Sequence, residues 1–269
     1  MRSKDGRTTK DGIRIHEQAD FAGMHVAGAL AAKILDDIAQ YVFPGQTTGE
    51  IDRLITQMVE DAGAKSATIG YKGYQHASCI SVNHVVCHGI PGDKKLKDGD
   101  ILNIDVTVIV DGWFGDTSRM FVAGKLSRKA ERLIQVTHDA LMKGIEAVKP
   151  GNTFGDIGHT IQAYVESQRM SVVRDFCGHG LGQVFHAPPN VLHYGRPGTG
   201  PVLEEGMFFT IEPMVNLGRP ETKILADEWT AVTRDKSLSA QFEHSIGVTA
   251  HGYDIFTLSP GGKFHPTYG

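Results

Sequence analysis

Residues 101–120 read ILNIDVTVIVDGWFGDTSRM. Apolar and polar side chains alternate through residues 102–110, which is the pattern of a β-strand with one apolar and one polar face. Asp111-Gly112 follows, a dipeptide that strongly favours a two-residue hairpin turn. Such a turn sets a register in which Val110 faces Trp113, Thr107 faces Asp116 and Asp105 faces Ser118. Asp105 and Asp116 then lie on one face as diagonal neighbours, about 7–8 Å apart or less.

Two carboxylates on the same face of a rigid hairpin repel each other unless a positive charge lies between them. A metal ion is the simplest such charge. The alternative is that Asp105 faces solvent and Asp116 caps a turn, which is the commoner arrangement for two acids in a hairpin. The hairpin alone leaves both interpretations open.

The composition is that of an ordinary globular protein. The chain has 269 residues, 41% of them hydrophobic, which suits one large domain or two small ones with a real core. Its net charge of -4 argues against a dedicated nucleic-acid binder, because binding to phosphates is driven by basic surface. No apolar run approaches the ~18–20 residues that a membrane span needs, so no membrane partner is expected.

The N-terminus and the cysteines bear on where the protein works. Residues 1–12, MRSKDGRTTKDG, carry charge but no apolar segment, so we expect a short flexible arm and not a secretory signal. The three cysteines, Cys79, Cys87 and Cys177, are odd in number and have no CxxC spacing. This pattern indicates reduced thiols in a cytoplasmic protein, and neither a disulfide framework nor a zinc finger.

Helical periodicity precedes the hairpin. From about residue 15 to 42, apolar residues recur at steps of three and four, which predicts a long amphipathic helix that ends at Pro44-Gly45. Thr47 and Glu50 have the spacing of a capping box for a second helix, which stops at Gly63. A strand is expected at 79–83, and residues 85–93 are expected to form a loop.

A similar unit follows the hairpin. Residues 133–148 predict another amphipathic helix, and PGNTFGDI at 150–157 matches PGQTTGEI at 44–51 at six of eight positions, counting the two acids as a match. At an offset of 106 residues, this indicates an internal repeat of helix, cap and helix. Each half of the chain is therefore expected to supply an acid from a corresponding central strand.

The second half offers three further candidate ligands. Glu212 lies in MFFTIEP at 207–213, a predicted strand, one residue from the position that the repeat assigns to Asp105. Glu243 lies in SAQFEHSIGVT at 239–249, another strand-like run. His179 is flanked by glycines in CGHG, which lets the backbone approach closely around a nitrogen ligand. With Asp105 and Asp116, these make four carboxylates and one imidazole, a set that balances two divalent cations and would be costly without them.

Five motifs form a highly specific ordered set: NIDVT, DGWFGDTSRMF, CGHGLG, TIEPM and SAQFEHS. With them the chain resembles the type I methionine aminopeptidases, the short bacterial kind, over about residues 13–251. The resemblance implies an α+β protein with the duplicated pita-bread fold, in which a pseudo-two-fold antiparallel sheet core is flanked by helices. It also implies a single catalytic domain at 13–251, with pseudo-repeats at about 13–124 and 125–251, and a C-terminal tail at 252–269.

The same resemblance implies a reaction and a cofactor. The protein would remove the N-terminal methionine from newly made proteins when the second residue is small, by attack of a hydroxide that bridges two divalent metal ions. The metal ligands that match the family are Asp105, Asp116, His179, Glu212 and Glu243. Cobalt, manganese, iron and zinc all suit such a set, and the ligands alone do not choose among them.

The matched motifs also imply residues that contact the substrate. His88, in VCHGIPG, is expected near the substrate amino end and the scissile amide, and His186, in VFHAPPN, is expected to hydrogen-bond the scissile carbonyl. Glu212 would accept the water proton and pass it to the leaving amine. A pocket for the methionine side chain, suited to a polarizable thioether, would be lined by Tyr71, Tyr74, Cys79, Phe185 and Trp229. Outside the motifs, such histidines are more often exposed loop residues and such aromatic residues more often packing.

Two other functions share the fold. Prolidases and Xaa-Pro aminopeptidases use a similar ligand set, but they usually carry a large extra N-terminal domain, and only a dozen or so polar residues precede the first helix here. Some pita-bread proteins have lost the metal ligands and serve as binding modules, which the intact ligand set argues against. A type II methionine aminopeptidase would need a long insertion in the second half, which is absent.

The expected partners follow from the implied reaction. They are the N-terminal peptides of nascent proteins, with a transient ribosome contact as a further candidate, and no nucleic acid is expected as substrate. A monomer is expected, because the sequence shows no evident surplus apolar face, and the cysteine pattern favours the cytoplasm.

Overall fold

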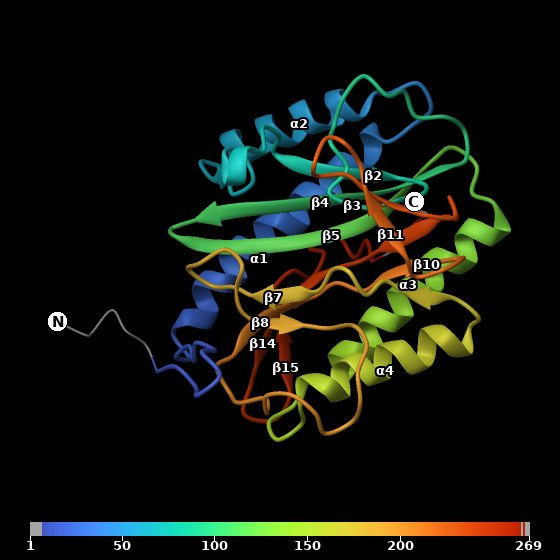
Figure 1. Ribbon diagram of the computed structural model, residues 1–269. Coiled ribbons are helices and arrows are strands. Elements are labelled where there is room, and N and C mark those ends of the chain that lie inside the picture. Colours follow the sequence, from blue (N-terminus) through green and yellow to red (C-terminus); the bar gives the residue numbers. More distant parts are fainter. Residues whose placement is uncertain (1–6, 265, 267–269) are drawn as a thin grey trace.

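Figure 1 shows the computed structural model, which describes residues 7–264 and 266. In this view α2 lies at the top and α4 at the bottom, with the sheets between them. The helices are α1 (Asp20–Ile38), α2 (Thr48–Asp61), α3 (Arg128–Glu146) and α4 (Phe154–Ser167), with 3₁₀ turns at Ala39–Tyr41 and Tyr71–Gly73. Residues 1–6 of the expected arm lie outside the described residues, as do 265 and 267–269 of the expected tail. Among the described residues, no helix has the length and apolar character needed to cross a bilayer.

The hairpin forms as the sequence predicts. β4 (Asp100–Val110) and β5 (Trp113–Ala123) pair antiparallel, and the facing pairs are Val110–Trp113, Thr107–Asp116 and Asp105–Ser118. Asp111 and Gly112 have φ values of 48° and 84°. Both are left-handed, as a type I′ turn requires. On its other edge β4 pairs with β1 (Lys65–Ser66) and β2 (Ser78–Val82).

The second half is built around a five-stranded sheet with the order β15-β14-β9-β7-β8. Its strands are β7 (Gly178–Gly180), β8 (Ala187–Val191), β9 (Phe208–Ile211), β14 (His244–Val248) and β15 (Tyr253–Ile255). Two three-stranded sheets, β13-β10-β6 and β11-β12-β3, complete the described sheet structure. Their strands are β3 (Val85–Cys87), β6 (Ser171–Val172), β10 (Met214–Asn216), β11 (Thr222–Ile224), β12 (Ala231–Thr233) and β13 (Ser239–Gln241).

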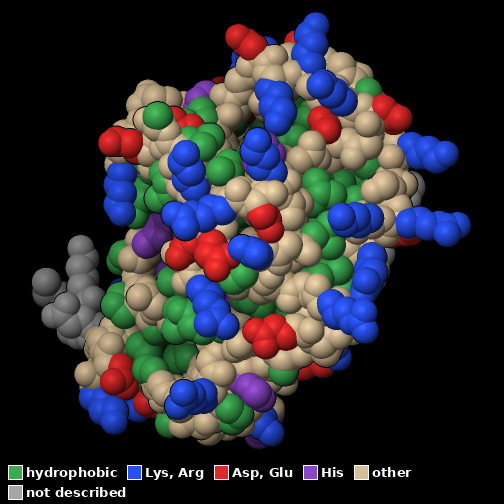
Figure 2. Space-filling model, turned by 45° about the vertical axis from the view of Figure 1, so that its right-hand side comes forward, with side chains coloured by type: hydrophobic (Ala, Val, Ile, Leu, Met, Phe, Trp, Pro, Cys, Tyr) green, Lys and Arg blue, Asp and Glu red, His purple; other side chains and the backbone are tan. Residues whose placement is uncertain are grey.

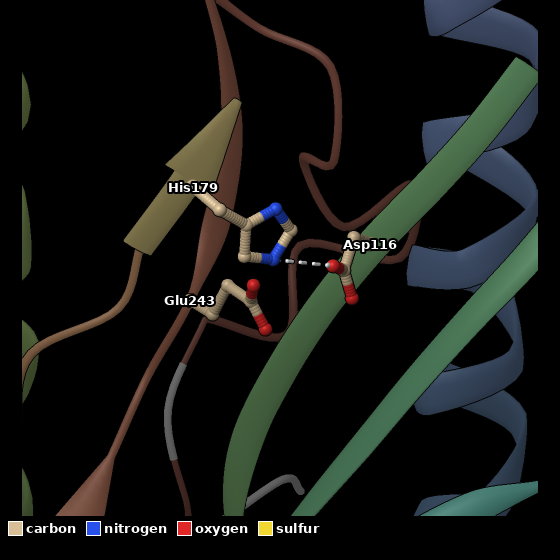
Figure 3. A group of neighbouring side chains, drawn as sticks. All are labelled: Asp116, His179 and Glu243. Carbon is tan, nitrogen blue, oxygen red and sulfur yellow. Dashed lines mark ion pairs between the residues drawn. The ribbon is translucent and has the colours of Figure 1, made fainter. Parts of the chain in front are cut away.

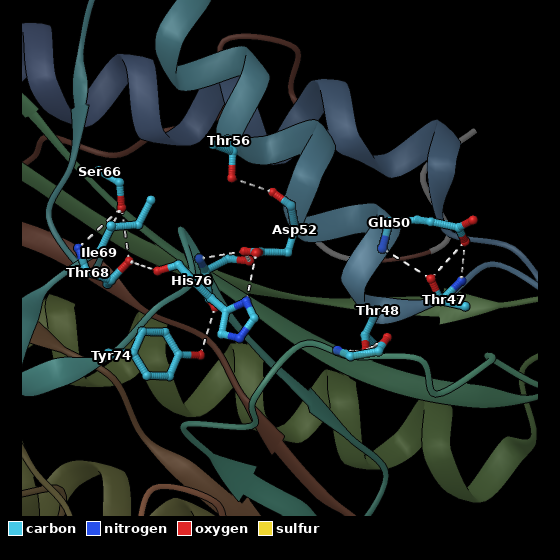
Figure 4. Close-up of polar contacts among 12 residues, drawn as sticks. Thr47, Thr48, Glu50, Asp52, Thr56, Ser66, Thr68, Ile69, Tyr74 and His76 are labelled. Atoms are coloured by element: carbon cyan, nitrogen blue, oxygen red, sulfur yellow. Dashed lines mark hydrogen bonds and ion pairs between the residues drawn. The ribbon is translucent and has the colours of Figure 1, made fainter.

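The repeat of helix, cap and helix is present in the structure. Thr47 caps α2 and Thr153 caps α4, each in a capping box completed by the acid three residues on, as Figure 4 shows for the first. The buried stripes also correspond at the offset of 106 residues. They are Ile51, Ile55 and Val59 in α2, and Ile157, Ile161 and Val165 in α4. The α2 stripe packs into an apolar cluster of the first half, and the α4 stripe packs into a larger cluster made mostly of residues from the second half.

Three local predictions are wrong. The first helix begins at Asp20 and not near residue 15, because the preceding segment is held extended, with the backbone amide of His16 donating to the Gly206 carbonyl (2.8 Å). Residues 85–87 form strand β3 inside the expected loop, because they pair with β12 from the other half of the chain. The run at 239–249 is divided into β13 and β14, and the break falls at residues 242–243.

The two halves meet where β5 runs beside the break between β13 and β14. The backbone amide of Glu243 donates to the Ser118 carbonyl (3.0 Å), and the Thr117 hydroxyl donates to the Glu243 carbonyl (2.7 Å). The Asn103 side chain donates to the Gln241 carbonyl (2.8 Å). These bonds fix an acidic residue of the second half against the hairpin of the first.

Candidate metal centre

All five predicted metal ligands line one cavity of about 820 Å³. Each comes from a different segment: Asp105 from β4, Asp116 from β5, His179 from β7, Glu212 from the residue after β9, and Glu243 from the break between β13 and β14. Because both halves of the chain contribute, the cluster is complete only when the halves are docked.

Three of these side chains converge at the centre of the site, as Figure 3 shows. Asp116, His179 and Glu243 are buried, and each offers a ligand atom within 4.8 Å of the others. Nε2 of His179 lies 3.4 Å from Oδ2 of Asp116 and 3.8 Å from Oε1 of Glu212. Atoms that bind one ion at about 2.0–2.2 Å are roughly 3–4 Å from each other, so these spacings suit shared coordination.

The acids are too crowded to be ionised together without cations. Burial raises the pKa of Asp105 and of Glu243 well above the usual range, and the Asp116 carboxylate adds to both shifts. Burial also raises the pKa of Glu212 to about 7, against the opposing effect of His179. Burial by itself would lower the pKa of His179, but Asp116 and Glu212 outweigh it and raise that pKa to about 9. This donor set fits divalent cations.

Two polar side chains, Thr210 and Gln241, hold the Glu212 carboxylate in place. The Thr210 hydroxyl donates to Oε1 of Glu212 (2.7 Å) and accepts from the backbone amide of His179 (3.0 Å). Nε2 of Gln241 donates to Oε2 of Glu212 (3.2 Å). A Cβ at Gly178 would lie 2.4 Å from the Thr210 carbonyl oxygen, so this close approach requires glycine. Thr210 and Gln241 share strand faces with the acids in the sequence, which is the signal that locates them.

Both predicted substrate histidines face the same cavity from strained backbone positions. His88 and His186 have φ values of 55° and 57°, a left-handed conformation that costs a non-glycine residue about 1–3 kcal/mol. The ring of His186 lies 4.1 Å from the ring of His179. Burial lowers the pKa of His88, and burial together with His179 lowers the pKa of His186 to about 4. Both rings are therefore neutral near pH 7 and can each donate one hydrogen bond.

The predicted methionine pocket forms an apolar wall of the cavity. The rings of Tyr74 and Trp229 are 4.9 Å apart, and those of Tyr71 and Phe185 are 5.0 Å apart. Cys79 lines the same cavity, and burial raises the pKa of its thiol, so it is uncharged. The wall offers soft, uncharged surface of the kind that a thioether prefers.

A carboxylate outside the metal cluster anchors this wall, as Figure 4 shows. Asp52 of α2 accepts hydrogen bonds from the backbone amide and the hydroxyl of Ser78 (2.9 and 2.8 Å), and its Oδ2 lies 3.1 Å from Nδ1 of His76. The Tyr74 hydroxyl donates to the Ser78 carbonyl (2.9 Å). The second helix thus holds the segment that carries Tyr74. No sequence pattern marks Asp52, because a single acid in an amphipathic helix is ordinarily exposed.

The structure brings all twelve predicted site residues to this cavity, and their individual roles stay predictions. The lining also includes residues that the sequence does not predict as part of the site, among them Cys87, Phe176, Cys177 and Met214. All three cysteines are free thiols. Cys177 and Met214 lie within the motifs CGHGLG and TIEPM, Cys87 lies beside His88, and Phe176 directly precedes Cys177, but nothing in their residue type distinguishes them from packing.

An antiparallel α+β fold whose two halves supply acids around one histidine defines a metallopeptidase of the pita-bread class, as the sequence predicts. The model of the metallopeptidase family M24 matches residues 22–250. The methionine aminopeptidase of Rickettsia prowazekii is 56% identical over 95% of this chain and 99% of that protein, and that of Escherichia coli is 52% identical over 91% and 94%. The chain therefore belongs to metallopeptidase family M24, among its methionine aminopeptidases.

Solved structures support this assignment. The crystal structure of methionine aminopeptidase from Rickettsia prowazekii superposes with a TM-score of 0.91 at 57% identity, covering 91% of this chain and 100% of that one. The prolidase of Pyrococcus horikoshii matches with a TM-score of 0.72 at 20% identity, covering 91% of this chain and 63% of that one. The second likeness concerns the fold alone, so the prediction that prolidases resemble this chain less is confirmed.

The raised pKa of Glu212 predicts how the metal-free protein responds to pH. Between the ordinary pKa near 4.5 and the folded value of about 7, the folded state holds a proton that the unfolded state has lost. The contribution of Glu212 to the free energy of unfolding is therefore largest below pH 4.5 and is lost as the pH rises through 7. In chelator, the unfolding free energy of the wild type minus that of Glu212→Gln should fall by about 2–3 kcal/mol between pH 5 and 8.

Urea unfolding at several pH values would measure this difference. Glu60→Gln, at an exposed position of α2, is the matched control and should show a difference that is flat with pH. A flat difference for Glu212→Gln as well would mean that burial does not raise its pKa.

Proposed function

We propose that this cavity hydrolyses the peptide bond that follows an N-terminal methionine, on substrates whose second residue is small. The observation that carries the proposal is that five side chains of the types that bind metal ions, two histidines and an apolar wall line the same cavity. The identity of 52–56% to methionine aminopeptidases over nearly the whole chain supports this reaction.

Asp105, Asp116, His179, Glu212 and Glu243 would hold two divalent ions, because four carboxylates offset the charge of two such cations. When bound, the ions supply Lewis acidity, which polarises a carbonyl and lowers the pKa of a coordinated water. Carboxylate-rich sites with one imidazole accept cobalt, manganese, iron and zinc, so we leave the metal open among these four.

Glu212 is the proton carrier in this proposal. Its carboxylate would take a proton from the attacking water and return it to the leaving amine. Hydrogen bonds from Thr210 and Gln241 hold its two carboxylate oxygens. The same side chain would also hold a metal ion, which would place the base close to a water that the ion activates.

The neutral histidines and the apolar wall would orient the substrate. His186 donates a hydrogen bond to the scissile carbonyl and so stabilises the developing oxyanion. His88 contacts the substrate near its amino end and the scissile amide. The methionine side chain lies against the wall formed by Tyr71, Tyr74, Cys79, Phe185 and Trp229, and the free α-amino group lies near the acids, which restricts cleavage to the first residue.

We extend the proposal to the cellular setting. The substrates are the N-terminal peptides of newly made proteins, met by a monomer in the cytoplasm, with a transient contact to the ribosome. Support for a reducing compartment comes from the three free cysteines. Nucleic acid and membrane have no part in the proposed reaction.

The first test is hydrolysis of Met-Ala-Ser and of a matched Xaa-Pro tripeptide by metal-stripped protein, with cobalt, manganese, iron or zinc added back. We expect metal-dependent release of methionine from the first peptide alone. Cleavage of only the Xaa-Pro peptide would assign the protein to prolidase-type activity. The absence of cleavage with every metal would favour a non-catalytic binding module.

The role of Glu212 is tested by Glu212→Gln, which keeps the shape of the side chain and removes the base. This variant should keep the fold and lose most turnover of Met-Ala-Ser, by about 10²-fold or more. Far-UV circular dichroism checks the fold, and Glu60→Gln serves as the control with normal turnover. Near-normal turnover by Glu212→Gln would exclude Glu212 as the proton carrier.

A further inference from the structure

The backbone of Glu212 is held by a residue that the proposed mechanism does not use. The ladder between β9 and β14 reaches Ile211, which pairs with His244, and stops one residue before Glu212. The amide of Glu212 donates instead to Nε2 of His193, at 3.0 Å. His193 lies in the loop after β8, and its exposed fraction is 0%.

This contact fixes the state of the His193 ring. An imidazole that accepts at Nε2 is neutral and carries its proton on Nδ1. Nδ1 of His193 is buried without a hydrogen-bond partner among the described residues. A buried donor without a partner is unfavourable, and an apolar side chain would fill the same space without that cost. Packing alone therefore does not account for a histidine at this position.

We infer that His193 is a positioning residue for Glu212, setting the direction in which its side chain leaves the backbone. Thr210 and Gln241 already donate hydrogen bonds to the Glu212 carboxylate. Those bonds determine the position of the side chain only if the Glu212 backbone is also fixed. On the other side of Glu212, Pro213 restricts the backbone to extended conformations. His193 fixes the Glu212 backbone at its amide group, because the pairing of β9 with β14 ends before this residue.

Two substitutions separate this role from packing. His193→Gln places an amide oxygen near the position of Nε2 and can still accept the hydrogen bond, whereas His193→Leu fills the space and cannot. We expect His193→Leu to lower kcat for Met-Ala-Ser by about 10- to 100-fold with little change in KM, and His193→Gln to keep most of kcat. Thr137→Val, which removes a buried hydrogen bond to the Leu133 carbonyl in α3, is the control and should leave kcat unchanged.

The hydrogen bond itself is measurable in metal-free protein. In the ¹⁵N-labelled wild type, a coupling across the hydrogen bond should join the Glu212 amide nitrogen to Nε2 of His193, and it should vanish in His193→Leu. The absence of this coupling in the wild type would overturn the inference, whether or not the variants fold. So would equal kcat in wild type and His193→Leu, or equal losses in the leucine and glutamine variants.

The inference rests on the proposed function, and the two can fail separately. If the wild type releases no methionine with any of the four metals, the proposed function fails, while the coupling still reports whether His193 holds Glu212. If the wild type is active and the leucine variant matches it, the reaction stands and the positioning role is wrong.

Discussion

The mutual repulsion of four carboxylates that share one cavity is the constraint on which the rest of this structure depends. Burial, with the charge of neighbouring carboxylates added, raises the pKa of Asp105, Glu212 and Glu243. Divalent cations relieve the repulsion and supply the chemistry of peptide hydrolysis. The metal-free state is therefore the strained one, and the surrounding fold has to hold the acids together against that strain.

Close backbone contacts hold the four acids together. The two-residue turn fixes the register that puts Asp105 and Asp116 on one face. At Gly115 the hairpin lies so close to α1 that a Cβ would be 2.2 Å from the Ala27 carbonyl oxygen. A backbone hydrogen bond to Ser118 and a bond from the Thr117 hydroxyl dock the Glu243 backbone directly onto β5. The candidate ligands from both halves thus converge through main-chain geometry, which tolerates little relative movement.

The sequence predicts the local parts of this arrangement well. Binary patterning and the Asp-Gly turn predict the hairpin register, and the capping boxes predict where α2 and α4 begin. Prediction from the sequence fails where contact with a strand distant in the chain determines the secondary structure. Strand β3 exists because β12 pairs with it, and the break before His244 exists because β5 competes for the Glu243 backbone.

The candidate site likewise contains residues that the sequence predicts and residues that it does not. The predicted ligand set rests on residue types and matched motifs, because metal chemistry restricts which side chains are useful, and the structure brings all five of its members to one cavity. Asp52 and His193 carry no such signal, since Asp52 acts through its contacts with His76 and Ser78, and His193 through Glu212, all of them distant along the chain. Residues that act through another residue are recognised only when the three-dimensional contacts are known.

The central claim is that the five-ligand cluster binds a pair of divalent ions. Anomalous diffraction from crystals grown with manganese tests it most directly, because the signal locates the ions without any assumption about activity. The account predicts two anomalous peaks in the cavity, contacted by Asp105, Asp116, His179, Glu212 and Glu243. An empty cluster at saturating manganese, or ions bound only elsewhere on the protein, would contradict it.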